Sequence, residues 1–358
     1  MVEGKVISIG NVAYVLGMDS KRLHRWYKEV LSGYKEALKN GQIGKDDIII
    51  REKGKQKKIK VPILKQENLG PYMAIDEKTI DGICYTILSN RESNKIAMMA
   101  DTLKVKHLAR ILSKLDNKME VRSLTRDMAS NYEWLGHQVF MNAYHVVDKF
   151  HVIKNAMDSL QAIRIRYRQQ ELEKRRTTKQ KFKQNQETEK WSAKLDGKKF
   201  YPHRFKYNEH IYSNGDTTLQ LLARSRGLLF ILPNKWSIHQ KQRAKILFDN
   251  YPEIKEAYYL ILQFRQWYKK PKTSINIRIK EKQLIEWVNK VKDANIYEMD
   301  NLSNMIDTHM KYIINYFLKS ETNAKAESLN SQIQRFVHIN YGARNTDFFL
   351  YRLISYFS

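Results

Sequence analysis

The chain has 358 residues, long enough for a full hydrophobic core and for two or three domains. Its 42% hydrophobic and 11% aromatic content predicts a folded protein and excludes a disordered basic tail. The 64 lysines and arginines outnumber the 38 aspartates and glutamates, which gives a formal net charge of +26. On a folded surface this charge favours a polyanion as partner, most commonly nucleic acid, over a merely solvated basic surface or an anionic membrane.

The cysteine content and the apolar runs narrow the class further. A single cysteine, Cys84, excludes a disulfide framework and a cysteine-based zinc site within this chain. The first residues, MVEGKVISIG, lack the apolar core of a signal peptide, and the longest apolar run, GLLFILP, is too short to span a bilayer. The sequence therefore predicts a soluble, cytoplasmic protein.

The N-terminal stretch has the pattern of two helices around a tight turn. Ala13 precedes Gly17 by four residues, and Leu16, Leu23 and Trp26 occupy core spacings. This pattern favours a DNA-binding helix-turn-helix, with a plain helical hairpin as the alternative. The candidate DNA contacts on the second helix are Lys21, Arg22 and Arg25.

From residue 70 onward, strand and helix patterns alternate in the order βββαβαβα. This order predicts an α/β fold of the ribonuclease-H-like type, in which a mixed sheet carries helices on its faces. Before it, residues 41–69 form a basic connector that could be a small β-hairpin or a DNA-contacting arm. The sequence alone does not decide between these two.

Three carboxylates lie where strands and a helix would direct them to one point. Asp76 is expected to end the first strand of the layer, and Asp127 the fourth, which lies beside the first in this order. Glu327 lies on a helix whose apolar stripe would pack it on the sheet. Converging carboxylates are the usual protein ligands of Mg²⁺ or Mn²⁺. Two such ions about 4 Å apart would activate a water or a 3′-hydroxyl for in-line phosphoryl transfer.

Each acid also has a structural interpretation. An aspartate at a strand end is often a turn or helix-cap residue, as Asp127 could be, and Glu327 beside Lys325 could simply lie on the surface. Glu77 and Asp81 have no such partners in the pattern and are expected to be turn and surface residues.

A strongly basic segment begins near residue 164 and is nearly free of aliphatic residues. It predicts a helix that follows DNA phosphates, and a solvated helix is the alternative. Its candidate DNA contacts are Arg164, Arg166, Arg168, Lys174, Arg175 and Arg176.

Several sequence blocks together resemble the DDE transposases of bacterial insertion sequences, of the ISL3 type. The blocks are AIDEKTI, LTRDMASNY, VVDKFHVIKNA, ETNAKAESLNSQIQRF and YGARNTDFFLYRL, which stand in the family's order over about residues 70–358. The resemblance implies a ribonuclease-H-like catalytic domain with a helical insertion between the second aspartate and the final glutamate. The 200 residues that separate Asp127 from Glu327 leave room for this insertion.

Carried over residue by residue, the resemblance makes Asp76, Asp127 and Glu327 the catalytic acids and the ligands of two Mg²⁺ or Mn²⁺ ions. Asp148 and His151 match an Asp-x-x-His signature found after the second aspartate in several transposase groups. They would support the site, as would Asn330; a capped helix with a satisfied histidine is the alternative for the first two.

The chain departs from the family in one respect. Members often carry an N-terminal zinc ribbon of paired cysteines, which a chain with Cys84 alone cannot form. A separate zinc-ribbon chain would then supply this module, or the chain is a truncated version of the family's protein.

The expected organisation has five segments in chain order. They are a helix-turn-helix domain at 1–40, a basic linker at 41–69, the first part of the catalytic core at 70–163, a mostly helical insertion at 164–318 and the C-terminal core helices at 319–358.

The predicted function is a nucleoid-associated bacterial transposase. It would bind double-stranded DNA at the terminal inverted repeats of its element, cleave there and join the ends to target DNA, as a homodimer or larger assembly. A ribonuclease-H-like nuclease or resolvase without strand transfer is one alternative. A catalytically inactive DNA-binding regulator is the other.

Overall fold

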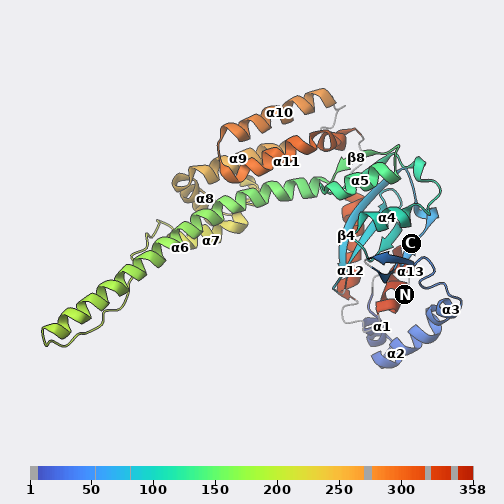
Figure 1. Cartoon of the computed structure of the whole chain (residues 1–358), viewed down its shortest axis with the longest axis horizontal. Coiled ribbons are helices and arrows are strands. Elements are labelled where there is room, and N and C mark those ends of the chain that lie inside the picture. Colours follow the sequence, from blue (N-terminus) through green and yellow to red (C-terminus); the bar gives the residue numbers. More distant parts are fainter. Residues whose placement is uncertain are drawn as a thin grey trace. The chain divides into compact units, whose positions relative to one another are not determined.

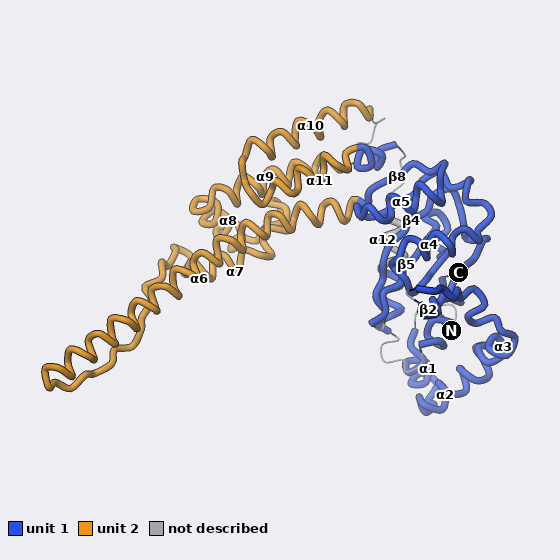
Figure 2. The backbone as a smooth tube through the Cα atoms, viewed as in Figure 1, with its two compact units in different colours: residues 1–148, 311–358 blue, residues 149–310 orange. Residues whose placement is uncertain are grey.

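The computed structural model describes residues 7–52, 54–80, 82–269, 276–318, 324–339 and 346–357, of which 324–330 are described without side chains. The chain divides into two compact units (Figure 2). Unit 1 comprises residues 1–148 and 311–358, and unit 2 comprises residues 149–310. Unit 2 thus begins at residue 149 and ends at 310, whereas the insertion was expected at 164–318. The reason is that one continuous helix starts at Lys149 and packs from its first turns within unit 2.

A six-stranded mixed sheet forms the centre of unit 1 (Figure 1). Its strands are β3 (Ile63–Leu64), β4 (Tyr72–Ile80), β5 (Ile83–Asn90), β6 (Ile96–Ala100), β7 (Ser123–Arg126) and β8 (Tyr144–Val147). The order is β3-β6-β5-β4-β7-β8, with β4, β5 and β6 antiparallel and β7 and β8 parallel to β4. The first strand of the expected layer, β4, therefore lies beside the fourth, β7. This arrangement is consistent with a ribonuclease-H-like fold.

Strand β4 is longer than the sequence predicted, and Asp76 lies within it instead of at its end. The strand continues because β5 pairs with it along its length, as far as Ile80 opposite Ile83. Gly82, with φ of +77°, adopts the left-handed conformation that a tight hairpin connection requires.

Helices cover both faces of the sheet and define two hydrophobic cores. On one face, α4 (Val105–Leu112) and α5 (Ser130–Val139) pack over Met73, Ile75 and Leu124. On the other face, α12 (Ala324–Ile339) and α13 (Thr346–Phe357) supply Ile333, Phe336 and Leu353, which pack on Tyr85, Ile87 and Met99 of the sheet.

The N-terminal helices belong to unit 1. They are α1 (Ile9–Val15), α2 (Ser20–Trp26) with its π-helical continuation (Tyr27–Leu31), and α3 (Tyr34–Lys39). Gly17, at φ of +63°, makes the expected turn between α1 and α2. The predicted core was wrong at Leu16 and Trp26, which are 56% and 47% exposed. Leu23 is buried as predicted, and Val12 and Tyr27 are buried with it, because this cluster packs against Phe348 of α13.

The basic connector is folded. Strands β1 (Ile48–Glu52) and β2 (Lys55–Ile59) form an antiparallel hairpin, with Ile48 opposite Ile59. Ile48, Ile50 and Ile59 are buried in the core beneath α4, which explains why this segment is not a free linker. Its contact with DNA stays a prediction.

Unit 2 is helical, as expected from the sequence. It contains α6 (Lys149–Leu195), α7 (Thr218–Leu228), α8 (Ile238–Asn250), α9 (Pro252–Trp267), α10 (Ile277–Asp293) and most of α11 (Tyr297–Ile314). The outer part of α6 extends beyond the other helices of this unit (Figure 1). Among the helices that the structure describes, none is long and apolar enough to cross a membrane.

Candidate active site and nucleic-acid surface

Three aspartates lie in or directly after three adjacent parallel strands of unit 1: Asp76 within β4, Asp127 after β7 and Asp148 after β8. Ala74 of β4 pairs with Thr125 of β7, so continuing this register by two residues places Asp76 beside Asp127. Arg126 pairs with Val147 of β8, so one further residue places Asp127 beside Asp148. Neighbouring strands lie about 4.8 Å apart. The strand order therefore sets Asp76 and Asp127 at neighbouring strands, with Asp148 one strand further along.

The pairing also decides which face Asp76 occupies. Asp76 is opposite Ile87 of β5, and directly opposed residues share a face of the sheet. Ile87 belongs to the core that α12 completes with Ile333 and Phe336. Asp76 therefore lies on the face that carries α12, the helix of Glu327.

Glu77, the neighbour of Asp76, points to the opposite face. It pairs with Thr86, and Oε1 of Glu77 accepts a 2.7 Å hydrogen bond from the Tyr132 hydroxyl of α5. Its expected place in a turn was wrong, because β4 continues past it. The strand thus separates two adjacent carboxylates and leaves only Asp76 on the side of α12.

Asp127 has a structural role that uses one of its oxygens. Its Oδ1 accepts a 2.9 Å hydrogen bond from the Ala129 amide, which shapes the turn into α5. Within the described part of the chain, Oδ2 of Asp127 has no hydrogen-bond donor. Asp127 can therefore shape the turn through Oδ1 and still offer Oδ2 to a cation.

The remaining predicted site residues are placed less completely. Glu327 and Asn330 lie on α12, but their side chains fall outside the described residues. Ile333 and Phe336, predicted to pack this helix on the sheet, are 0% and 2% exposed. Six residues, or about 9 Å of helical rise, separate Glu327 from Ile333. His151 lies in the first turns of α6 and belongs to unit 2.

The donor set fits a hard divalent cation in part. Two carboxylates on neighbouring strands offer the oxygen ligands that Mg²⁺ or Mn²⁺ requires. Among the side chains that the structure describes, no group of three His, Cys, Asp or Glu residues is arranged to hold a metal ion. Asp76 and Asp127 can thus be two ligands of such an ion. The third expected ligand is Glu327 of α12, whose side chain lies outside the described residues.

Sequence reasoning missed a buried polar cluster directly behind Asp127. Arg126 is 0% exposed, and its guanidinium donates to Oε2 of Glu133 at 2.9 Å and to Nδ1 of His145 at 3.3 Å. Burial, together with the charges of His137 and Arg126, lowers the pKa of His145 to about 4. The available signal was an arginine in an apolar strand, where alternation turns it toward the core.

Gly136 of α5 makes room for this cluster. A Cβ atom at this position would approach Cε1 of His145 to 2.6 Å, so a larger residue would displace the imidazole. Nε2 of His145 is buried without a hydrogen-bond partner in the described structure.

Two cations predicted to contact DNA are instead part of the packing of unit 2. Arg164 is 6% exposed and donates to the side chain of Gln161 at 2.7 Å and to the carbonyl of Leu222 at 3.0 Å. Arg166 pairs with Glu298 and Glu253, whose hydrogen bonds raise its pKa. Arg164 and Arg166 therefore make contacts within unit 2 in place of the predicted contacts with DNA.

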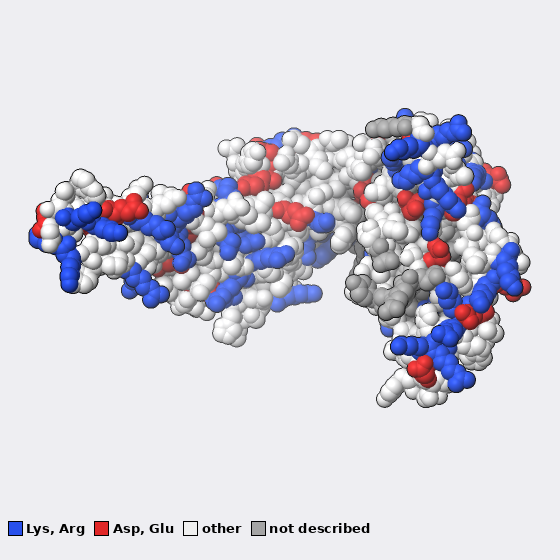
Figure 3. Space-filling view, turned by 60° about the horizontal axis from the view of Figure 1, so that its bottom comes forward, with Lys and Arg blue, Asp and Glu red and all other residues white. Residues whose placement is uncertain are grey.

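The outer part of α6 presents its cations to solvent. We define the arm as residues 168–212, the distal part of α6 with the segment that returns along it. Phe205 and Tyr207 of the returning segment contact Phe182 and Glu171 of α6. The arm holds thirteen lysines and arginines against six acids, a surplus of seven positive charges. Figure 3 shows these cations spread along the arm. Arg168 is half-buried, and the exposed candidates are Lys174, Arg175 and Arg176.

The second N-terminal helix also presents its predicted contacts to solvent. Lys21, Arg22 and Arg25 are all exposed on α2. Asp19 caps this helix by accepting a 2.8 Å hydrogen bond from the Arg22 amide. The geometry leaves these three cations available to a phosphate backbone.

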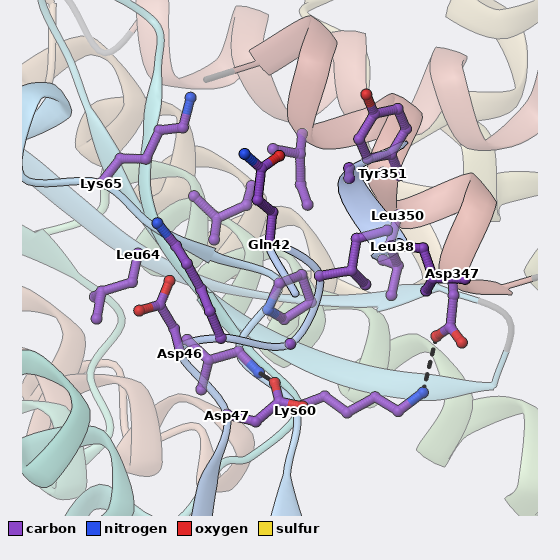
Figure 4. A pocket seen from close by; sticks show the side chains of 18 of the residues that line it. Leu38, Gln42, Asp46, Asp47, Lys60, Leu64, Lys65, Asp347, Leu350 and Tyr351 are labelled. Carbon is purple, nitrogen blue, oxygen red and sulfur yellow. Dashed lines mark hydrogen bonds and ion pairs between the residues drawn. The ribbon is translucent and has the colours of Figure 1, made fainter. Parts of the chain in front are cut away.

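Figure 4 shows a cavity of about 500 Å³ in unit 1, whose lining does not include Asp76, Asp127 or Asp148. It lies where α3, the β2–β3 connection and α13 meet, and Leu38, Gln42 and Tyr351 line it. Two of its lysines form ion pairs within the lining, Lys58 with Asp47 at 3.0 Å and Lys60 with Asp347 at 2.9 Å. None of the predicted catalytic residues lines this cavity. We interpret it as a gap in the packing between these elements.

The chain was compared with known families and proteins. A family model described as a DDE transposase of the ISL3 type matches residues 73–353, which is most of the chain. No curated protein and no solved structure matches the chain. The matched range contains Asp76, Asp127, Asp148 and Glu327 and spans parts of both units.

Proposed function

The chain belongs to the ISL3-type family of DDE transposases, and on that premise we propose that it cleaves DNA and transfers strands at the ends of an insertion sequence. It would bind the terminal inverted repeats, cut there and join the freed 3′ ends to target DNA. The observation that carries this proposal is the parallel register that aligns Asp76 with Asp127.

In this proposal Asp76, Asp127 and Glu327 hold two Mg²⁺ or Mn²⁺ ions in a ribonuclease-H-like core. The ions would supply an activated water or 3′-hydroxyl and stabilise the leaving oxygen. The protein positions the carboxylates: β4 fixes the face of Asp76, and the turn at Ala129 orients Asp127 through Oδ1. The packing of α12 on the same face supports the arrival of Glu327 there.

Asp148 is proposed as a supporting residue. Its amide donates a 2.8 Å hydrogen bond to the carbonyl of Arg126, which ties the end of β8 to the end of β7. A carboxylate there adds negative charge beside Asp127 and would strengthen cation binding. His151 and Asn330 are kept as candidates for the same role.

DNA binding is proposed at two basic surfaces, one in each unit. The exposed cations of α2 would contact the terminal repeat, and the exposed cations of the arm would follow phosphates. Because two element ends must be paired before joining, a homodimer or larger assembly is the proposed active form. A separate zinc-ribbon chain is a further proposed partner.

Strand cleavage of a duplex that carries the inverted repeats flanking the coding region tests this function. With Mg²⁺, the wild type is expected to nick the repeat end and to join the 3′ end to a second duplex. Asp76→Asn and Asp127→Asn are expected to lose at least about a hundredfold in rate, because each removes a charged ligand. Filter binding should show that both variants still bind the duplex.

Glu77→Gln is the matched control. This residue is adjacent to Asp76 but faces α5, and the amide keeps an acceptor for the Tyr132 hydroxyl. It should cleave at the wild-type rate. Cleavage without joining would instead identify a nuclease, and salt-dependent binding without any metal-dependent cleavage would identify a DNA-binding regulator.

A further inference from the structure

The buried guanidinium of Arg126 calls for a physical explanation. Arg126 is 0% exposed, and burial lowers its pKa because the charged form loses its hydration. A buried charge persists when hydrogen bonds and an opposite charge replace the lost water. An apolar residue of similar volume would fill this space more simply.

Its partners come from separate elements of unit 1. Nη2 donates to Oε2 of Glu133 on α5 at 2.9 Å, and Nε donates to Nδ1 of His145 on β8 at 3.3 Å. The guanidinium also lies 4.8 Å from the ring centre of Tyr312. The Tyr312 hydroxyl in turn donates to Oε1 of Glu133 at 2.7 Å. Glu133 and Tyr312 therefore hold the guanidinium in one orientation.

The remaining contacts act on the strand end that carries Asp127. Nη1 of Arg126 donates to the main-chain carbonyl of Asp127 at 2.9 Å. The main-chain carbonyl of Arg126 accepts from the amide of Asp148 at 2.8 Å. One residue thus fixes the peptide of Asp127 through its side chain and the start of Asp148 through its backbone.

The side chain of Arg126 does not neutralise the carboxylate of Asp127. Successive residues of a strand point to opposite faces, and Arg126 packs toward α5 while Asp127 follows on the other side. The contact is to the carbonyl of Asp127 alone. The side-chain hydrogen bond of Arg126 thus holds the backbone of Asp127 and leaves the carboxylate oxygens to other partners.

We propose that Arg126 is a positioning residue that fixes the main chain of Asp127, so that its carboxylate stays beside that of Asp76. This inference rests on the proposed function, in which the two carboxylates share a divalent cation. Residues that orient ligands typically change metal affinity by about 10–100-fold when they are replaced.

Mn²⁺ binding without DNA, followed by electron paramagnetic resonance, tests the inference apart from activity. Arg126→Met is expected to weaken Mn²⁺ binding by about tenfold or more. Arg126→Lys keeps the charge but not the fork of donors, so it should lie between Met and the wild type. Tyr312→Phe removes only the hydroxyl that holds Glu133 and should have the smallest effect.

Cleavage kinetics provide a second readout. At saturating DNA the kcat of Arg126→Met should fall while KM for DNA stays unchanged, and added Mn²⁺ should restore part of the rate. Arg352→Met is the control, because Arg352 is another buried arginine of unit 1 that packs over Tyr27 and Phe336. It should lower thermal stability without changing Mn²⁺ affinity.

Wild-type Mn²⁺ affinity and kcat in a folded Arg126→Met would overturn the inference, as would an equal loss of affinity in Arg352→Met. If Arg126→Met does not fold, Arg126→Lys and Tyr312→Phe decide by the same criteria. Failure of the proposed function would appear in the wild type, as absence of cleavage, and the Mn²⁺ series would still decide the role of Arg126. A wild type that binds no Mn²⁺ would overturn both.

Discussion

The inner and outer parts of helix α6 use the same kinds of side chain in opposite ways. Near its start, Arg164 is buried and Arg166 holds two glutamates of unit 2. Farther along, Lys174, Arg175 and Arg176 are exposed. The inner part contacts α7, α9 and α11, whereas the outer part contacts the returning segment of the arm. A basic run therefore predicts charge, but tertiary packing decides which cations can reach DNA.

Unit 1 shows the same contrast between buried and exposed arginines. Arg126 is fully buried and surrounded by acceptors, whereas Arg22 and Arg25 of α2 are exposed. In each unit, the enclosed arginines belong to the packing and the exposed ones are available to a partner.

The largest effect is expected from an enclosed arginine. Arg164→Ala leaves Gln161 and the carbonyl of Leu222 without their donor and opens a space in unit 2. The free energy of unfolding should fall by about 2–4 kcal/mol in urea titrations. Arg175→Ala, on the exposed part of the same helix, should change it by less than about 0.5 kcal/mol. Equal losses in the two variants would remove the distinction between the inner and outer parts.

The enclosed cluster of unit 1 predicts sensitivity to acid. The folded pKa of His145, about 4, lies below the ordinary value of 6.5. As the pH falls through 6.5 the unfolded chain binds a proton that the folded chain does not, so stability is lost between pH 6.5 and 4. The full shift is equivalent to about 3–4 kcal/mol. The charged or titratable groups that act on this imidazole are His137, Arg126, Glu133 and Lys311.

His145→Asn isolates this contribution. The amide oxygen can still accept from Nε of Arg126 but does not titrate. Urea unfolding at several pH values should show a shallower loss of stability in the variant than in the wild type between pH 6.5 and 4. Parallel pH profiles would show that His145 is not the group responsible.

The exposed cations of the arm should affect binding and leave folding unchanged. Replacing Lys174, Arg175 and Arg176 together by glutamine should reduce the salt slope of DNA binding by up to about 2.7, since each phosphate contact contributes about 0.9. Affinity near physiological salt should fall by about tenfold. Fluorescence anisotropy over a salt series measures both quantities.

A charge-matched control is available in the same unit. Lys245, Lys255 and Lys282 are exposed on α8, α9 and α10, outside the arm. Their replacement by glutamine removes the same charge and should leave the slope unchanged. A similar slope change in both triple variants would mean that the arm is not a specific contact.

The smallest effect is expected from an exposed pair. Lys60 and Asp347 join the start of α13 to the β2–β3 connection at 2.9 Å, and their side chains are 48% and 52% exposed. Asp347→Asn should cost less than about 1 kcal/mol, because solvent screens the pair. Thermal unfolding measures this, and a loss above about 2 kcal/mol would show that exposure does not govern the value of an ion pair here.

Much of the sheet was predictable because its signals are local. Strands β5, β6 and β8 are rich in apolar residues, and the predicted order βββαβαβα forms from β4 to α6. The family resemblance was also carried by contiguous blocks and is confirmed by the family match. Asp76 and Asp127 could be proposed as neighbours because the strand order places β4 beside β7.

The remaining features depend on contacts between distant parts of the chain. The burial of Arg164 requires α7, and the network of Arg126 requires Tyr312, far along the sequence. The exposure of Trp26 follows from the packing of Phe348 against another side of the N-terminal helices. The local pattern of apolar residues does not contain this information, because it does not determine which helix covers which face of its neighbours.

The most direct test of the central claim is the metal specificity of Asp127→Cys. A thiolate is a poor ligand for Mg²⁺ but a better one for the softer Mn²⁺. If Asp127 binds the catalytic ion beside Asp76, the variant should cleave the element end with Mn²⁺ and lose activity with Mg²⁺, while the wild type uses both. Wild-type cleavage by Asp127→Cys with Mg²⁺ would contradict the account, because no ligand of the ion would then have been replaced.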